Sequence, residues 1–253
     1  MGKTALATNI AYHASKNLQE NNEKGSVAFF SLEMSSEQLS TRILSEQARI
    51  SSSEIRTGKA SEETLNRYIE TSRNIYDLPL YIDETPAIAI STLSNRARRI
   101  KRLFGLKLIV VDYIQLMKTN TNRMDGRVQE ISEITQGLKA LAKELNVPVV
   151  ALSQLSRAVE QRDDKIPQLS DLRESGSIEQ DADVVVFVYR EQYYLEKKEP
   201  KQGSIEHAEW QSKMSDIHGL ANLIIGKHRH GSTGTIHVEF EGMFTKFKDL
   251  PKN

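Results

Sequence analysis

The chain alternates between short apolar runs and longer segments in which apolar residues recur every three or four positions. Short unbroken runs are typical of strands buried on both faces, and the longer pattern is typical of amphipathic helices. Strands are therefore predicted at 27–32, 80–82, 108–111, 149–152, 184–189 and 220–225. Because helical segments separate most of these runs, we expect an α/β fold with a mainly parallel sheet.

Four helical faces are predicted between the strands. The first helix runs from Thr4 to Glu20, and in the second Ser35 and Gln38 resemble a capping box. The apolar faces of the other helices are expected to lie in the core: Leu39, Ile43 and Leu44; Leu65, Tyr68, Ile69 and Ile75; Ile131, Ile134, Leu138 and Leu141.

The pattern changes in the last third of the chain. Strands at 235–240 and 244–247 are separated by glycines, which predicts antiparallel hairpins at one edge of the sheet. The charged stretch 191–219 contains the only tryptophan, Trp210, and is interpreted as a surface insertion. We find no linker that would split residues 1–253, so one domain is expected.

Composition narrows the classes of function. The 34 basic and 34 acidic residues cancel, so any contact with nucleic acid must come from local loops. There are no cysteines, which excludes disulfides and thiol catalysis. Neither a long apolar span nor a signal-peptide pattern is found, so a cytoplasmic protein is expected.

Gly2, Lys3 and Thr4 match the end of the phosphate-loop pattern GxxxxGK[ST]. In a complete loop, glycine-rich backbone cradles the phosphates, the lysine reaches the outer phosphates, and the hydroxyl binds Mg²⁺. Their place at a helix N-terminus suits an anion, because unpaired N–H groups and the helix dipole meet there. The alternative is an ordinary helix start.

Polar residues follow three of the predicted strands. Asp112 ends the run 108–111, Glu33 follows 27–32, and Gln154 follows 149–152. In open α/β sheets, ligands bind at the carboxyl ends of the strands. There an aspartate suits a hydrated Mg²⁺, a glutamate can accept a proton from water, and an amide can sense phosphate. Each also has an ordinary alternative as a turn or capping residue.

Five segments in this order resemble the ATPase domain of bacterial replicative DNA helicases, the DnaB family. They are SLEMS (31–35), LIVVDYIQLM (108–117), LKALAKELNVPVVALSQLSR (138–157), DLRESGSIEQDAD (171–183) and GKHRHGSTGT (226–235). The resemblance covers nearly the whole chain and is weakest at 191–219. It implies a RecA-like fold that assembles into a hexameric ring around one DNA strand and moves 5′ to 3′.

The resemblance also implies roles for particular residues. Gly2, Lys3 and Thr4 would bind ATP phosphates, with Thr4 and Asp112 at Mg²⁺. Glu33 would polarise water, and Gln154 would couple nucleotide state to DNA loops. Arg229 would be an arginine finger reaching a neighbouring subunit's nucleotide, with Lys227 beside it. The family more often has glutamine where this chain has His228. Primase and a helicase loader are the partners that the family implies.

For DNA, the resemblance points to a pore loop containing Arg173, Glu174 and Gly176. A glycine allows close approach of main chain to the strand, and arginine offers a charged contact to phosphate. Arg123 and Arg127 are weaker candidates. The basic run Arg96, Arg98, Arg99, Lys101 and Arg102 spreads around a helix and is interpreted as solvated surface.

Two other functions remain open at this point. One is a recombinase-like or regulatory RecA-fold ATPase that does not unwind DNA. The other is an inactive fragment of the helicase, because the strand that leads into the phosphate loop is expected to be central in this fold and no segment of the sequence matches it. Its neighbours would then have unpaired backbone groups, and we expect this chain by itself to bind ATP poorly.

Overall fold

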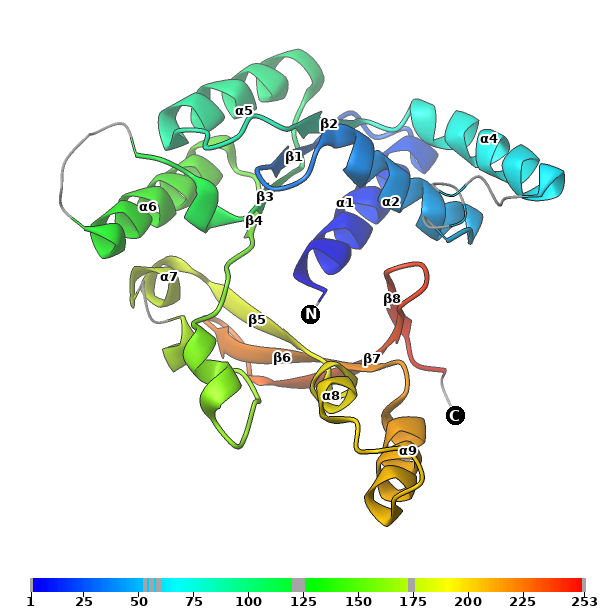
Figure 1. The fold of residues 1–253 in the computed structure, drawn as a ribbon. Helices are drawn as coiled ribbons and strands as arrows, with labels where there is room; N and C mark the ends of the chain where they lie inside the picture. The colour runs from blue at the N-terminus through cyan, green and yellow to red at the C-terminus, as the bar shows by residue number, and fades with distance from the viewer. Residues whose placement is uncertain are drawn as a thin grey trace.

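The computed structural model describes residues 2–51, 54, 57, 61–119, 126–172 and 176–251. Its first half is a parallel four-stranded sheet in the order β2-β1-β3-β4 (Figure 1). The strands are β1 (Val27–Ser31), β2 (Leu80–Asp83), β3 (Leu108–Asp112) and β4 (Val149–Ala151). All of them lie within one or two residues of the predicted positions.

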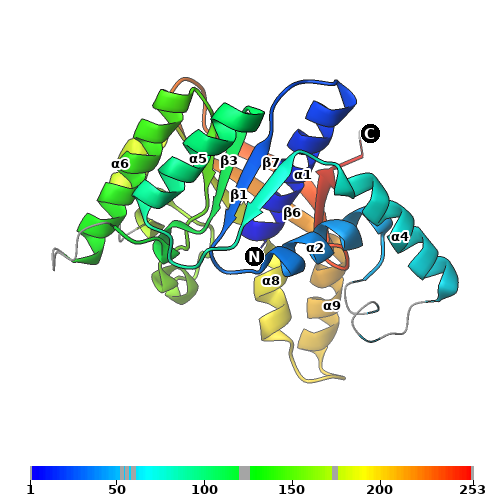
Figure 2. The same cartoon turned by 90° about the horizontal axis from the view of Figure 1, so that it is seen from above.

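Helices cover both faces of this sheet (Figure 2). Helix α5 (Ile90–Phe104) and helix α6 (Arg127–Leu145) pack on one face, where Phe30, Ile109 and Val111 are buried. Helix α1 (Lys3–Glu20) and helix α2 (Ser36–Ala48) pack on the other face, over Phe29 and Val110. Burial on both sides explains why β1 and β3 are apolar at nearly every position.

Helix α4 (Glu62–Tyr76) corrects one prediction. Its apolar face was expected in the core, yet α4 has no buried residue, and Leu65 and Ile69 are 46% and 49% exposed. The helix packs mainly against α2 rather than over the sheet, so half of its apolar face is left at the surface. The other predicted faces are confirmed at Leu39, Ile43, Ile131, Ile134, Leu138 and Leu141, all of which are buried. The capping box of Ser35 and Gln38 is also present.

The second half is an antiparallel sheet in the order β5-β6-β7-β8. Its strands are β5 (Val184–Tyr189), β6 (Leu220–His228), β7 (Gly234–Glu241) and β8 (Lys246–Asp249). The antiparallel part therefore begins one strand earlier than expected, at β5, and β8 starts two residues later than expected. Helix α7 (Gly176–Asp181) precedes β5, and short 3-10 helices lie at Ile114–Leu116, Arg157–Gln161 and Leu169–Asp171.

Residues 191–219 form a helical projection on the second sheet (Figure 1). It consists of α8 (Glu191–Leu195), a 3-10 turn at Glu196–Lys198 and α9 (Ile205–Ile217). The Trp210 indole N–H donates to the carbonyl oxygen of Leu195, 2.9 Å away, and so ties α9 to α8.

The two sheets have facing ends that are not hydrogen-bonded to each other. Within the described residues, β4 pairs only with β3, and β5 pairs only with β6. Val184 and Val186 of β5 are 47% and 46% exposed. Each of these two strands therefore has one edge whose backbone groups have no strand partner.

Candidate nucleotide and DNA site

The segment Gly2 to Thr4 begins α1. Gly2 is the N-cap with φ 109°, a backbone conformation that favours glycine, and no side chain caps the helix. The first turn contains no acidic residue. The N–H groups at this end are therefore available to an anion.

Lys3 and Thr4 lie beside Asp112 at the carboxyl end of β3. Burial is the main influence on Asp112 and raises the pKa of its carboxyl group, while a hydrogen bond with the Thr4 side chain and the charge of Lys3 oppose this. Burial likewise lowers the pKa of Lys3, against the charges of Asp112 and Glu33. The three side chains that the phosphate-loop pattern and the strand end predicted are thus brought together.

One oxygen of Asp112 has no partner. Asp112 is 1% exposed, and its Oδ2 atom is buried without a hydrogen bond to any described residue. A buried carboxylate oxygen costs free energy unless it binds a donor or a cation. Together with the Thr4 hydroxyl it offers the oxygen ligands that Mg²⁺ prefers, so the residues fit this ion.

Glu33 lies at the mouth of the same sheet. Its charge acts on Lys3 and Asp112, which places it at their cluster. It also lines an open cavity of about 270 Å³ together with residues of the β1 and β2 ends: Ser31, Leu32, Met34, Ser35, Glu84 and Pro86. This position leaves space for water beside the carboxylate.

Gln154 is held next to Lys3 by the chain after β4. The Lys3 ammonium donates to the Ser153 carbonyl oxygen at 2.6 Å. Gln115 clamps the neighbouring Gln154 backbone: its Oε1 accepts from the Gln154 N–H at 3.2 Å, and its Nε2 donates to the Gln154 carbonyl oxygen at 3.3 Å. Arg127, a weaker DNA candidate, donates to the carbonyl oxygen of Gln115.

The sequence prediction missed Arg42 of α2. Burial lowers the pKa of its guanidinium, and the charges of Asp112 and Glu33 partly restore it. Arg42 is therefore a second cation, besides Lys3, within electrostatic reach of the two carboxylates. Its spacing of nine residues after Glu33 places it two turns into α2, a pattern that carries no chemical signature by itself.

Lys227 and Arg229 stand at the end of β6 and do not join this cluster. Arg229 Nη1 lies 3.0 Å from Asp183 Oδ1, and its side chain is 47% exposed. Lys227 donates to the carbonyl oxygen of Glu179 at the end of α7. No hydrogen bond or ion pair of the described residues links either cation to Lys3, Thr4, Asp112 or Glu33.

Of the predicted DNA loop, Arg173 and Glu174 lie outside the described residues, as does Arg123. Gly176 begins α7, and a Cβ atom built on it would meet nothing within 4 Å. The basic run on α5 is tied to the surface: Arg98 binds Glu144, and Arg96 binds Asp83. Arg98, Arg99 and Arg102 are exposed, as expected of solvated surface.

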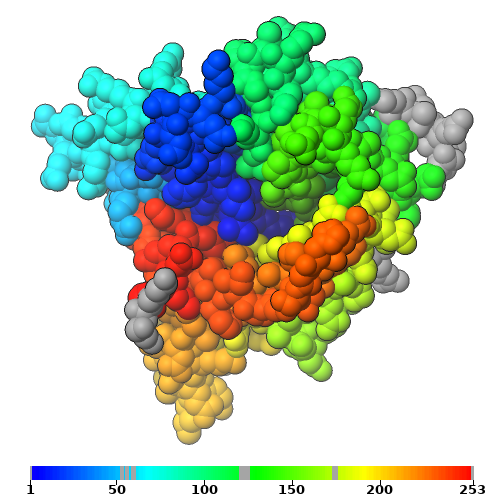
Figure 3. All heavy atoms as spheres, turned by 180° about the vertical axis from the view of Figure 1, so that it is seen from behind, coloured from blue at the N-terminus to red at the C-terminus, as the bar shows by residue number. Residues whose placement is uncertain are grey.

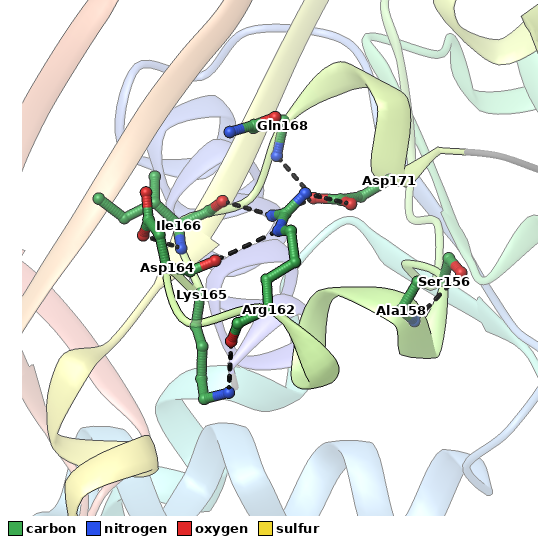
Figure 4. A network of polar contacts seen from close by, with 8 residues as sticks. All are labelled: Ser156, Ala158, Arg162, Asp164, Lys165, Ile166, Gln168 and Asp171. Carbon is green, nitrogen blue, oxygen red and sulfur yellow. Dashed lines mark hydrogen bonds and ion pairs between the residues drawn. The ribbon is translucent and has the colours of Figure 1, made fainter.

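The segment before the loop is braced by one buried ion pair (Figure 4). Arg162 donates to both carboxylate oxygens of Asp171 at 2.9 Å, and also to the carbonyl oxygens of Asp164 and Ile166. The carbonyl oxygen of Asp171 accepts from the Ser156 N–H at 2.9 Å. The end of the segment is thereby fixed to the chain that follows Gln154.

Residues 1–249 match the family model described as the DnaB-like helicase C terminal domain. The chain belongs to this family. The replicative DNA helicase DnaB of Rickettsia typhi is 54% identical over 257 residues, which is all of this chain and 52% of that protein. DnaB of Geobacillus stearothermophilus is 43% identical and is covered to 51%. This DnaB-like chain thus spans about half the length of the curated relatives that it matches.

Solved structures agree with the family. One of them, an isolated ATPase domain, is 34% identical with a TM-score of 0.83, covering 99% of this chain and 81% of that one. The structure of a DnaB-like replicative helicase and its interactions with primase has 33% identity, a TM-score of 0.84 and coverage of 99% and 55%. The RadB recombinase, at 16% identity and a TM-score of 0.52, shares the fold alone. The predicted RecA-like α/β fold is confirmed.

No described helix of this DnaB-like domain is long and apolar enough to cross a membrane.

Proposed function

We propose that this chain is the motor domain of a replicative DNA helicase, which hydrolyses ATP to move along single-stranded DNA from 5′ to 3′. The observation that carries the proposal is the buried Oδ2 atom of Asp112, which has no partner and lies in the cluster with Thr4 and Lys3 at the start of α1. Family membership favours this function over a RecA-fold ATPase that does not unwind DNA.

Each residue of the cluster has one task in this proposal. Gly2 and the following N–H groups hold phosphate, while Lys3 neutralises its outer charge. Thr4 and Asp112 hold Mg²⁺, which bridges phosphate oxygens when bound. Glu33 accepts a proton from the attacking water, for which the adjoining cavity leaves space. Gln154 reports the γ-phosphate to the DNA-facing segments.

Arg229 and Lys227 act on a neighbouring subunit in a hexameric ring. Arg229 is half exposed and has no contact with its own chain's cluster, which supports a role in trans. A guanidinium offers forked donors to the charge that develops on the transferred phosphoryl group. Hydrolysis then depends on assembly.

For DNA, we propose backbone tracking by the loop that contains Arg173, Glu174 and Gly176, which requires no base recognition. Primase and a helicase loader are the proposed protein partners, by likeness to the family. We place the protein in the cytoplasm, where replication takes place in bacteria.

The test is ATP hydrolysis with and without single-stranded DNA, measured on the full-length protein. Asp112→Ala is expected to abolish hydrolysis, and DNA is expected to stimulate the unchanged protein. A fork-unwinding assay separates a helicase from a non-unwinding ATPase. Hydrolysis that persists in the Asp112→Ala variant would remove the site assignment.

A further inference from the structure

Glu46 is a buried acid that the nucleotide cluster does not use. It lies on α2 and is 1% exposed, although a carboxylate is costly to bury without partners. Burial raises its pKa to about 7, while Lys246, Asn9 and Gln47 oppose the shift. Its side chain lies where α1, α2 and β8 meet.

Asn9 joins Glu46 to β8 by using both ends of its side-chain amide. Asn9 Nδ2 donates to Glu46 Oε2 at 2.5 Å, and Asn9 Oδ1 accepts from the backbone N–H of Phe247 at 2.8 Å. Because one end must donate and the other must accept, Glu46 fixes which way the amide points. Glu46 Oε1 accepts from Gln47 Nε2 at 3.0 Å and lies 3.9 Å from Lys246 Nζ.

The residue that this amide holds lies against the phosphate-binding segment. A Cβ atom built on Gly2 would lie 3.0 Å from Cζ of Phe247, so the ring packs directly on Gly2. The Phe247 ring also packs on the Phe240 ring of β7, with centroids 4.7 Å apart. Figure 3 shows the red C-terminal strands side by side with the blue N-terminal helix.

We propose that Asn9 and Glu46 form a positioning pair that docks β8 on α1 and thereby holds Phe247 against Gly2, on the side away from the nucleotide phosphates. This inference rests on the proposed function of Gly2 to Thr4. The pair acts through Phe247 and does not itself contact the nucleotide. It gives the C-terminal hairpin a direct influence on the geometry of the phosphate-binding turn.

The test exploits the direction of the hydrogen bonds. Asn9→Asp keeps an acceptor for the Phe247 N–H but places a carboxylate oxygen against Glu46. Adding Glu46→Gln supplies a new donor and restores the bond with reversed polarity. Hydrogen exchange at the Phe247 amide is expected to speed up about tenfold in Asn9→Asp and to return within about twofold of the unchanged protein in the double variant.

The affinity for Mg-ATP, measured by calorimetry, is expected to follow the same order: weaker by about fivefold in Asn9→Asp, which corresponds to about 1 kcal/mol, and restored in the double variant. Gln47→Ala is the matched control, since it removes the other hydrogen bond to Glu46 and leaves Asn9 in place. It should change neither quantity by more than about twofold.

Several results would overturn the inference. One is exchange that rises equally in β1, β3 and β8 in Asn9→Asp, because this indicates general loss of stability. Others are a double variant that fails to recover, or a released Phe247 amide with unchanged Mg-ATP affinity. If Asn9→Asp does not fold, folding of the double variant supports the pair and its failure opposes it. If Lys3→Met leaves Mg-ATP affinity unchanged, the proposed function fails instead, and the exchange data still decide whether the pair docks β8.

Discussion

The Lys3 ammonium donates a hydrogen bond to the Ser153 carbonyl oxygen, so the start of α1 and the end of β4 are joined across 150 positions of sequence. Ser153 is followed directly by Gln154. A phosphate that draws Lys3 away from this carbonyl would therefore change the contacts of the segment that leads to Asp171 and the DNA loop. This relationship gives a physical route from the nucleotide to the DNA side of the molecule.

Replacing Lys3 with methionine keeps most of the side-chain volume and removes the charge. We expect ATP hydrolysis to fall by about 100-fold or more, because the phosphate charge loses its partner. Lys16→Met is the matched control, since Lys16 lies on the same helix in an exposed pair with Glu20. Steady-state hydrolysis measures both, and equal losses in the two variants would contradict the role of Lys3.

Glu46 predicts a pH dependence of stability. Its pKa is about 7 in the folded protein and is raised by burial from 4.5. The folded state thus holds a proton that the unfolded state releases, so stability is highest at low pH and falls as pH rises from about 5 to above 7. The stability of Glu46→Gln should lack this component.

Chemical denaturation of both proteins at pH 5 and pH 8 measures the effect. We expect Glu46→Gln to gain about 2 kcal/mol relative to the unchanged protein between these two values. Lys246, Tyr12 and His13 also face this region, but they are present in both proteins, so their titration largely cancels in the difference. A difference that does not vary with pH would contradict the prediction.

Two bidentate arginine pairs should differ in their effect on stability. Arg162 binds Asp171, whose side chain is 5% exposed, whereas Arg98 binds Glu144, whose side chain is 48% exposed. Arg162→Met leaves a buried carboxylate with fewer donors and should lower the free energy of unfolding by about 2 kcal/mol. Arg98→Met should change it by less than about 1 kcal/mol. Equal effects in urea denaturation would show that burial does not decide between them.

The open edges of β4 and β5 predict poor behaviour of these 253 residues expressed alone. Unpaired buried backbone groups cost about 1 to 3 kcal/mol each, against a total stability of about 5 to 15 kcal/mol. We expect weak ATP binding and concentration-dependent association. Calorimetry and light scattering measure these two properties, and micromolar Mg-ATP affinity in a monomeric sample would contradict the expectation.

The local pattern predicts the strands well because burial on both faces demands unbroken apolar residues, as in β1 and β3. The pattern is less informative for β5. Its apolar residues resemble a parallel core strand, but pairing with β6 makes it antiparallel and leaves Val184 exposed. For α4, periodicity shows that one face is apolar, but it does not specify whether that face packs on a sheet or on another helix.

By itself, the sequence determined the α/β order of elements, the family, and the residues of the phosphate-binding end: Gly2, Lys3, Thr4, Glu33, Asp112 and Gln154. These follow from local spacing and from residue types that carry their own chemistry. Only the tertiary structure decided that Arg42 joins the two carboxylates, that Asp183 holds Arg229, and that Asn9 links Glu46 to Phe247. The physical reason is that hydrogen bonds and burial depend on distances between segments far apart in the chain, and local sequence patterns do not contain those distances.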